Sequence, residues 1–147
     1  MSPEQRLAEL GLTLPEKKAK GGNYELAVQT GNLLFLSGNL SYDHIGKLGQ
    51  EFTVEQGYEA SREAALQALA TIKQELGDLS HVKKFVKVLA FINCTMDFTS
   101  HAKVMNGFSD LVVSVFGEGI GTHARTSIGA ILPRGAAIEL EMVVEVD

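Results

Sequence analysis

The chain has 147 residues, enough for one domain, and its 45% hydrophobic and 21% charged content is typical of a globular protein. Its 13 lysines and arginines against 18 aspartates and glutamates give a formal charge of −5, which disfavours nucleic acid because such binding is largely electrostatic. The single cysteine, Cys94, excludes an intrachain disulfide, and no apolar run approaches the ~20 residues of a membrane span. The first residues do not have the pattern of a secretory signal, so we expect a cytoplasmic protein.

The first 37 residues predict a short helix followed by a β-hairpin. Ser2–Gln5 has the residue types of a helix start with a capping box, and Gly11 ends this helix. Residues 24–30 and 33–37 predict two strands, and Gly31-Asn32 between them suits a tight two-residue turn. We expect one domain over residues 1–147, with residues 1–20 as a peripheral N-terminal extension.

The middle of the chain predicts a loop, a long helix and a long strand. Residues 39–52 predict the loop, and apolar residues at helical spacing predict a helix over residues 54–76. Residues 82–94 are rich in valine, isoleucine and phenylalanine and predict the strand. Alternation places Phe85 on one face and a second apolar set on the other: Val86, Val88, Ala90, Ile92 and Cys94. A strand that is apolar on both faces predicts helices against one face and another subunit against the other.

The last third predicts a second long helix and a second hairpin. Apolar spacing predicts a helix over residues 100–116, and the glycines of residues 117–121 predict a loop. No helix pattern follows these glycines, so a phosphate-binding loop is not expected. Residues 123–132 and 136–146 predict strands joined at residues 133–135. This order of elements predicts an α+β fold, a β-sheet with two main helices on one face.

The predicted second hairpin gathers polar side chains on one face. If the even-numbered apolar residues face the core, the odd-numbered residues of both strands share the other face: His123, Arg125, Ser127 and Gly129 with Glu139, Glu141 and Glu145. The Arg125 guanidinium suits a substrate carboxylate, and Glu139 nearby can position a water or act as general acid or base. The alternative is an ordinary cross-strand ion pair between Arg125 and Glu139 or Glu141.

Other reactive residue types do not predict a second site. Cys94 lies on an apolar strand face, where a structural thiol is expected. The four histidines lie in different elements and do not have metal-ligand spacing: His44, His81, His101 and His123. We therefore expect neither a metal ion nor an organic cofactor. His123 is the histidine that shares the expected face with Arg125.

Several segments resemble the RidA/YjgF family, also called the L-PSP endoribonuclease family. Residues 32–37 with Gly38 resemble the family's first hairpin, and residues 104–116 are similar to its second main helix. Residues 123–129 followed by residues 132–141 (arginine, a short strand, Leu-Pro, then Ile-Glu-Leu-Glu) resemble its C-terminal signature. The resemblance extends from about residue 23 to the C-terminus. It implies a chorismate-mutase-like fold and a homotrimer with clefts between subunits.

The resemblance also implies roles for particular residues. Arg125 stands where the family's deaminases have the arginine that grips the carboxylate of a 2-imino acid. Glu139 matches the glutamate that places the attacking water. Four further residues match positions in or beside the cleft: Tyr24, Gly38, Asn106 and Ser127, the last standing where many members have cysteine.

Three functions are consistent with these observations. The first is an enamine or imine deaminase that hydrolyses reactive 2-imino acids to 2-keto acids and ammonia. The second is a non-enzymatic homotrimer that binds a small carboxylate-bearing metabolite in the same cleft. The third is the endoribonuclease of the family's older name, against which the net charge and the absence of a basic stripe argue.

Overall fold

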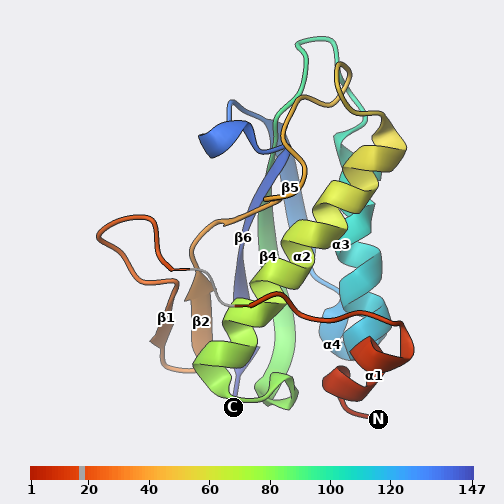
Figure 1. Cartoon of the computed structure of the whole chain (residues 1–147). Coiled ribbons are helices and arrows are strands. Elements are labelled where there is room, and N and C mark those ends of the chain that lie inside the picture. Colours follow the sequence, from red (N-terminus) through yellow and green to blue (C-terminus); the bar gives the residue numbers. More distant parts are fainter. Residues whose placement is uncertain (17–18) are drawn as a thin grey trace.

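A mixed β-sheet carries two long helices on one face (Figure 1), which confirms the α+β class expected from the sequence. The computed structural model describes residues 1–16 and 19–147; Lys17 and Lys18, which belong to the expected N-terminal extension, lie outside the described residues. The elements in chain order are α1 (Pro3–Glu9), β1 (Ala27–Thr30), β2 (Leu33–Leu36), β3 (Asn39–Leu40), α2 (Val54–Leu76), the short 3-10 helix η1 (Leu79–His81), β4 (Val82–Ile92), α3 (His101–Phe116), α4 (Glu118–Gly121), β5 (Ala124–Gly129), the 3-10 turn η2 (Pro133–Gly135) and β6 (Ile138–Val146).

The strand order is β1-β2-β6-β4-β5, and β3 pairs with β6 beside this path. β5 is parallel to β4, whereas the other strand pairs are antiparallel. β4 therefore separates β5 from β6, and the second hairpin expected from the sequence is wrong. The reason is the helix α3 between β4 and β5, because a helical crossover returns the chain to the same end of the sheet and allows parallel pairing.

The first hairpin is confirmed, and two expected loops contain regular structure. Thr30 pairs with Leu33, so Gly31 and the next residue form a two-residue turn, and Gly31 has the positive φ of 57° that such a turn favours. Within residues 39–52, β3 pairs with Leu140 and its neighbour in β6. Residues 117–121 include α4, which an apolar pattern does not reveal because the helix has four residues.

An irregularity in β4 changes which residues face the helices. The pairing of β4 with β6 shifts register between Phe85 and Lys87. A bulge of this kind adds one residue and reverses the alternation on either side of it. Phe85 is consequently fully buried and Val86 is 41% exposed, whereas Val88 is buried. The expectation that Val86 shares a face with Val88 is wrong for this reason.

The two long helices approach each other closely. α2 begins at the capping box of Thr53 and Gln56 and ends before Gly77, so the expected helix over residues 54–76 is confirmed. At the contact, Ser61 Oγ donates a hydrogen bond of 2.7 Å to the Val104 carbonyl. A Cβ atom on Gly107 of α3 would overlap the Tyr58 carbonyl of α2. Gly107 therefore sets the separation of the two helices.

The sheet face away from the helices has exposed apolar side chains. Ile128 of β5 is 46% exposed and pairs with Phe91 of β4. Phe35 of β2 is 43% exposed and pairs with Val143 of β6. Exposed apolar side chains spread over several strands mark a face that another protein surface can cover.

The close approach at Gly107 predicts a large effect of one methyl group. Gly107→Ala should lower the free energy of unfolding by about 1–3 kcal/mol, because the added carbon forces α2 and α3 apart. Gly119→Ala is the matched control, since nothing lies within 4 Å of a Cβ placed there. Urea denaturation measures both variants. Equal stabilities of the two variants would contradict this account of the helix contact.

Candidate functional site

Arg125 lies on the helix side of the sheet, held against α3. It pairs with Val88 of β4, whose side chain is buried beneath the helices. Arg125 Nη1 donates to Asn106 Oδ1 at 3.1 Å and to Ser109 Oγ at 2.8 Å, and Nη2 donates to the Ala102 carbonyl at 3.3 Å. These bonds use three of the five N–H donors of an arginine and fix the plane of its guanidinium.

Glu139 lies on the opposite face of the sheet. It stands in β6 between Ile138 and Leu140, both fully buried on the helix side, so alternation directs Glu139 away from the helices. The expectation that Arg125 and Glu139 share a face of one chain is therefore wrong. It depended on the hairpin that β4 interrupts. Among residues 1–16 and 19–147, Arg125 also forms no ion pair with Glu139 or Glu141, the alternative expected from the sequence.

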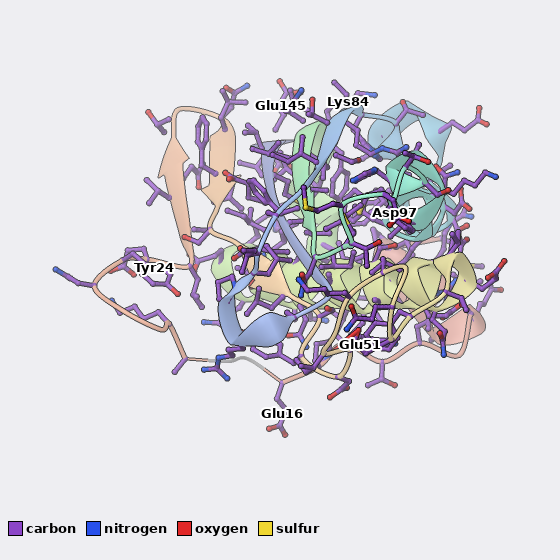
Figure 2. All side chains as sticks on the ribbon, turned by 90° about the horizontal axis from the view of Figure 1, so that it is seen from above. Glu16, Tyr24, Glu51, Lys84, Asp97 and Glu145 are labelled. Carbon is purple, nitrogen blue, oxygen red and sulfur yellow. The ribbon has the colours of Figure 1, made fainter. Side chains whose placement is uncertain are left out.

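Glu139 lines a pocket of about 270 Å³, and Tyr24, Gly38 and Arg134 are among the other residues that line it. A Cβ atom on Gly38 would overlap the Glu139 carboxylate, so a glycine is needed for this close approach. Tyr24 accepts a hydrogen bond from the Gly21 N–H at its hydroxyl, at 2.9 Å. Tyr24 lies on the segment before β1, on the other side of the molecule from α3 (Figure 2).

The structure thus divides the expected site residues between two places. Tyr24, Gly38 and Glu139 come together in the pocket beside β3 and β6. Arg125 contacts Asn106, and Ser127 lies two residues further along β5 with its side chain on the same face as Arg125. Each group is half of the site that the sequence suggested.

Sequence reasoning did not select Ser109, and it gave His123 no role. Ser109 lies three residues after Asn106, and residues at that spacing share one side of a helix. Ser109 Oγ lies 2.9 Å from His123 Nε2, and His123 Nδ1 lies 2.6 Å from the Gly121 carbonyl oxygen. The helical spacing from Asn106 was a signal that pointed to Ser109. The contact of Ser109 with His123 could not be predicted from the sequence, because it depends on β5 lying beside α3.

Electrostatics differ between the two places. Burial, and to a lesser extent Glu141, raises the pKa of Glu139 above its ordinary value of 4.5. Burial lowers the pKa of His123 below its ordinary value of 6.5. The hydrogen bond to the Gly121 carbonyl raises this pKa, whereas the charges of Arg125 and Lys84 lower it further. Glu139 therefore holds its proton to a higher pH than a free carboxyl, and His123 is neutral at pH 7.

The described part of the chain has two further features that bear on function. It contains no cluster of three or more His, Cys, Asp or Glu side chains arranged to hold a metal ion. None of its helices is both long and apolar enough to cross a membrane.

This fold and the signature around Arg125 and Glu139 define a class of small α+β proteins of the chorismate-mutase-like type. Residues 4–140 match the family model described as "YjgF/chorismate mutase-like, putative endoribonuclease". The chain belongs to this family, as its resemblance to RidA/YjgF proteins indicated.

Known proteins similar to this chain come from several organisms. Protein TCP17 of Trypanosoma cruzi is 42% identical, with the alignment covering 96% of this chain and 92% of TCP17. A solved "putative endoribonuclease" of Shewanella oneidensis is 35% identical over 99% of this chain and 100% of its own, with a TM-score of 0.96. TdcF of E. coli, solved with bound serine, is 20% identical over 92% of this chain and 96% of its own, with a TM-score of 0.58, and shares the fold.

The raised pKa of Glu139 predicts a pH-dependent effect of Glu139→Gln. A carboxyl whose pKa is raised in the folded state is more stable there protonated than ionised. Its contribution to the free energy of unfolding is therefore full below pH 4.5 and is lost as the pH rises through the raised pKa. Glu139→Gln removes this loss and should gain stability relative to the natural protein between pH 4 and pH 8.

Urea midpoints at several pH values measure this difference, with Glu75→Gln on the exposed side of α2 as the control. A difference that stays constant with pH for Glu139→Gln would contradict the raised pKa.

Proposed function

We propose that this protein hydrolyses 2-imino acids to 2-keto acids and ammonia, in a cleft between the subunits of a homotrimer. The observation that carries the proposal is the orientation of Arg125 by three acceptors of α3. Two N–H donors, one of them on Nε, have no acceptor among the described residues. They offer a carboxylate the two-pronged contact for which arginine is suited.

The division of the site between two places supports an intersubunit cleft. Arg125 and Glu139 lie on opposite faces of the sheet in one chain, so one molecule cannot bring them to the same ligand. Because β5 is an edge strand, a second copy that packs on the open face and extends past this edge can bring its Glu139 to the Arg125 of its neighbour. The exposed Phe35 and Ile128 are the side chains that such packing would bury.

In the proposed reaction Arg125 holds the substrate carboxylate and Glu139 of the neighbouring subunit handles the protons. Water adds to the C=N carbon and gives its proton to the Glu139 carboxylate. The carboxyl returns this proton to the nitrogen of the adduct. The carboxylate then takes the proton of the adduct's hydroxyl group and passes it to the same nitrogen, so that ammonia leaves as the C=O bond forms. A carboxyl whose pKa is raised suits both transfers, since it exchanges protons closer to neutral pH.

A ligand of this kind is consistent with one structural relative. TdcF was solved with bound serine, a 2-amino acid that has the carboxylate Arg125 is proposed to hold. The alternative of a non-enzymatic carboxylate-binding trimer uses the same Arg125 contact and differs in the absence of turnover.

The assembly is tested by introducing a charge on the open sheet face. Sedimentation velocity of the natural protein should give the mass of a trimer. Phe35→Glu should give a monomer, because packing would bury an unpaired carboxylate. Leu10→Glu is the control, since Leu10 is 50% exposed at the end of α1. A natural protein that sediments as a monomer at micromolar concentration would rule out the intersubunit cleft.

Catalysis is tested by ammonia release from imines that an amino-acid oxidase generates in place. Arg125→Ala should lower kcat/KM about 10- to 150-fold, since a charge-assisted bond to a carboxylate contributes about 1.5–3 kcal/mol. Arg125→Lys should recover only part of this loss, because an ammonium does not have the two-pronged geometry. Arg6→Ala, on an exposed part of α1, is the control.

Two outcomes would select the other functions. Unchanged ammonia release across several amino-acid precursors, together with 2-ketobutyrate binding that Arg125→Ala abolishes, would indicate the binding module. Cleavage of RNA that Arg125→Ala abolishes would indicate the endoribonuclease.

A further inference from the structure

A serine, a histidine and a main-chain carbonyl form a chain of hydrogen bonds beside Arg125. Ser109 of α3, His123 before β5, and Arg125 line a pocket of about 190 Å³. Ser109 Oγ lies 2.9 Å from His123 Nε2, and the Gly121 carbonyl oxygen lies 2.6 Å from His123 Nδ1. The proposed imine hydrolysis does not use this serine or this histidine.

The partners fix the direction of each hydrogen bond. The Gly121 carbonyl can only accept, so His123 Nδ1 carries the proton and the neutral ring presents Nε2 as an acceptor. Ser109 then donates its hydroxyl proton to Nε2. Arg125 can only donate, so its 2.8 Å contact with Ser109 Oγ is a bond that the serine oxygen accepts. Phe108 packs edge-on against the imidazole at 5.3 Å and holds the ring in place.

This arrangement has the parts of an activated nucleophile. A serine within hydrogen-bond reach of a histidine, whose other nitrogen a third group orients, is the general pattern for nucleophilic hydroxyls. The positive charge of Arg125, 2.8 Å from Ser109 Oγ, favours loss of the hydroxyl proton to His123. We propose that Ser109 is a nucleophile for acyl transfer, with His123 as its base, and that the substrate is a short ester with a free carboxylate.

The substrate class comes from Arg125 and the size of the pocket. The two N–H donors that Arg125 keeps can hold a carboxylate, while its Nη1 stays on Ser109. A pocket of about 190 Å³ admits a short chain and no large acyl group. An ester of a dicarboxylic acid would thus reach Ser109 with one end held by Arg125.

The reaction balances without a metal or an oxidant. Ser109 Oγ attacks the ester carbonyl, His123 Nε2 takes the hydroxyl proton, and the C–O bond to the alcohol breaks as His123 protonates the leaving oxygen. Water then attacks the acyl-serine, gives a proton to His123, and the acid leaves as Ser109 regains its proton. The pKa of His123, lowered mainly by burial, keeps the imidazole unprotonated at pH 7.

The test uses mono(4-nitrophenyl) adipate and, as the matched ester without a carboxylate, 4-nitrophenyl hexanoate. The natural protein should release 4-nitrophenol from the adipate ester at least about 100-fold faster than Ser109→Ala or His123→Phe, the lower end of what acid–base groups usually contribute. Ser114→Ala, on the exposed side of the same helix, should match the natural protein. Arg125→Ala should remove the preference for the adipate ester.

Acid quenching during turnover separates a nucleophile from a structural serine. Mass analysis should find one acyl group on the peptide that contains Ser109, and Ser109→Cys should retain an acyl group at the same position as a thioester. The rate should fall only below pH 6.5, where His123 becomes protonated. The proposal is overturned if the natural protein hydrolyses the ester no faster than Ser109→Ala and has no acyl group on Ser109. It is also overturned if the acyl group is found on another residue. Both results are independent of whether ammonia is released from imines.

Discussion

The parallel pairing of β5 with β4 decides where the polar groups of the candidate site lie. This pairing makes β5 an edge strand and places Arg125 next to Val88, on the side of the sheet that α3 covers. α3 then supplies acceptors to the guanidinium from two side chains and one carbonyl. If β5 paired with β6, Arg125 would face Glu139 and the two charges would neutralise each other within one chain. In the parallel arrangement Arg125 forms no ion pair with a carboxylate of residues 1–16 or 19–147, which is what the proposed contact with a ligand carboxylate requires.

The same arrangement explains why one chain holds two incomplete halves of a site. Glu139 lies on the open face over Gly38, where a larger residue would displace its carboxylate, and its raised pKa comes mainly from burial. Arg125 lies on the helix side, and two of its N–H donors have no acceptor among residues 1–16 and 19–147. The carboxyl of Glu139 is suited to exchanging protons, and Arg125 is suited to holding a carboxylate, so the two groups have complementary roles toward one ligand. Their separation within the chain, together with the apolar open face, favours a site completed by another copy.

The sequence predicted local structure well and long-range pairing less well. The helix over residues 54–76 and the turn at Gly31 followed from spacing and turn chemistry, which neighbouring residues determine. The prediction of a second hairpin was wrong, because the choice between a parallel and an antiparallel partner for β5 depends on how α3 crosses the sheet. The sequence did not predict the bulge at Val86, because an extra residue within an apolar run does not change the residue types by which a strand is predicted. The sequence identified Arg125 and Glu139 as candidates, but it placed them on one face because it paired β5 with β6. The contact of Ser109 with His123 could not be predicted, because it depends on how α3 lies against β5.

Arg125 links the two proposed activities electrostatically. It donates to Ser109 Oγ, and its charge helps to lower the pKa of His123. A carboxylate bound to the free N–H donors of Arg125 would offset that charge without breaking the bond to Ser109. The pKa of His123 would then rise, which makes the imidazole a stronger base while leaving it neutral as long as its pKa stays below the ambient pH. A ligand with a carboxylate therefore strengthens the base that activates Ser109, whereas an uncharged ester does not. In the proposed ester hydrolysis, Arg125 would therefore select carboxylate-bearing substrates through this effect on His123 as well as through direct binding.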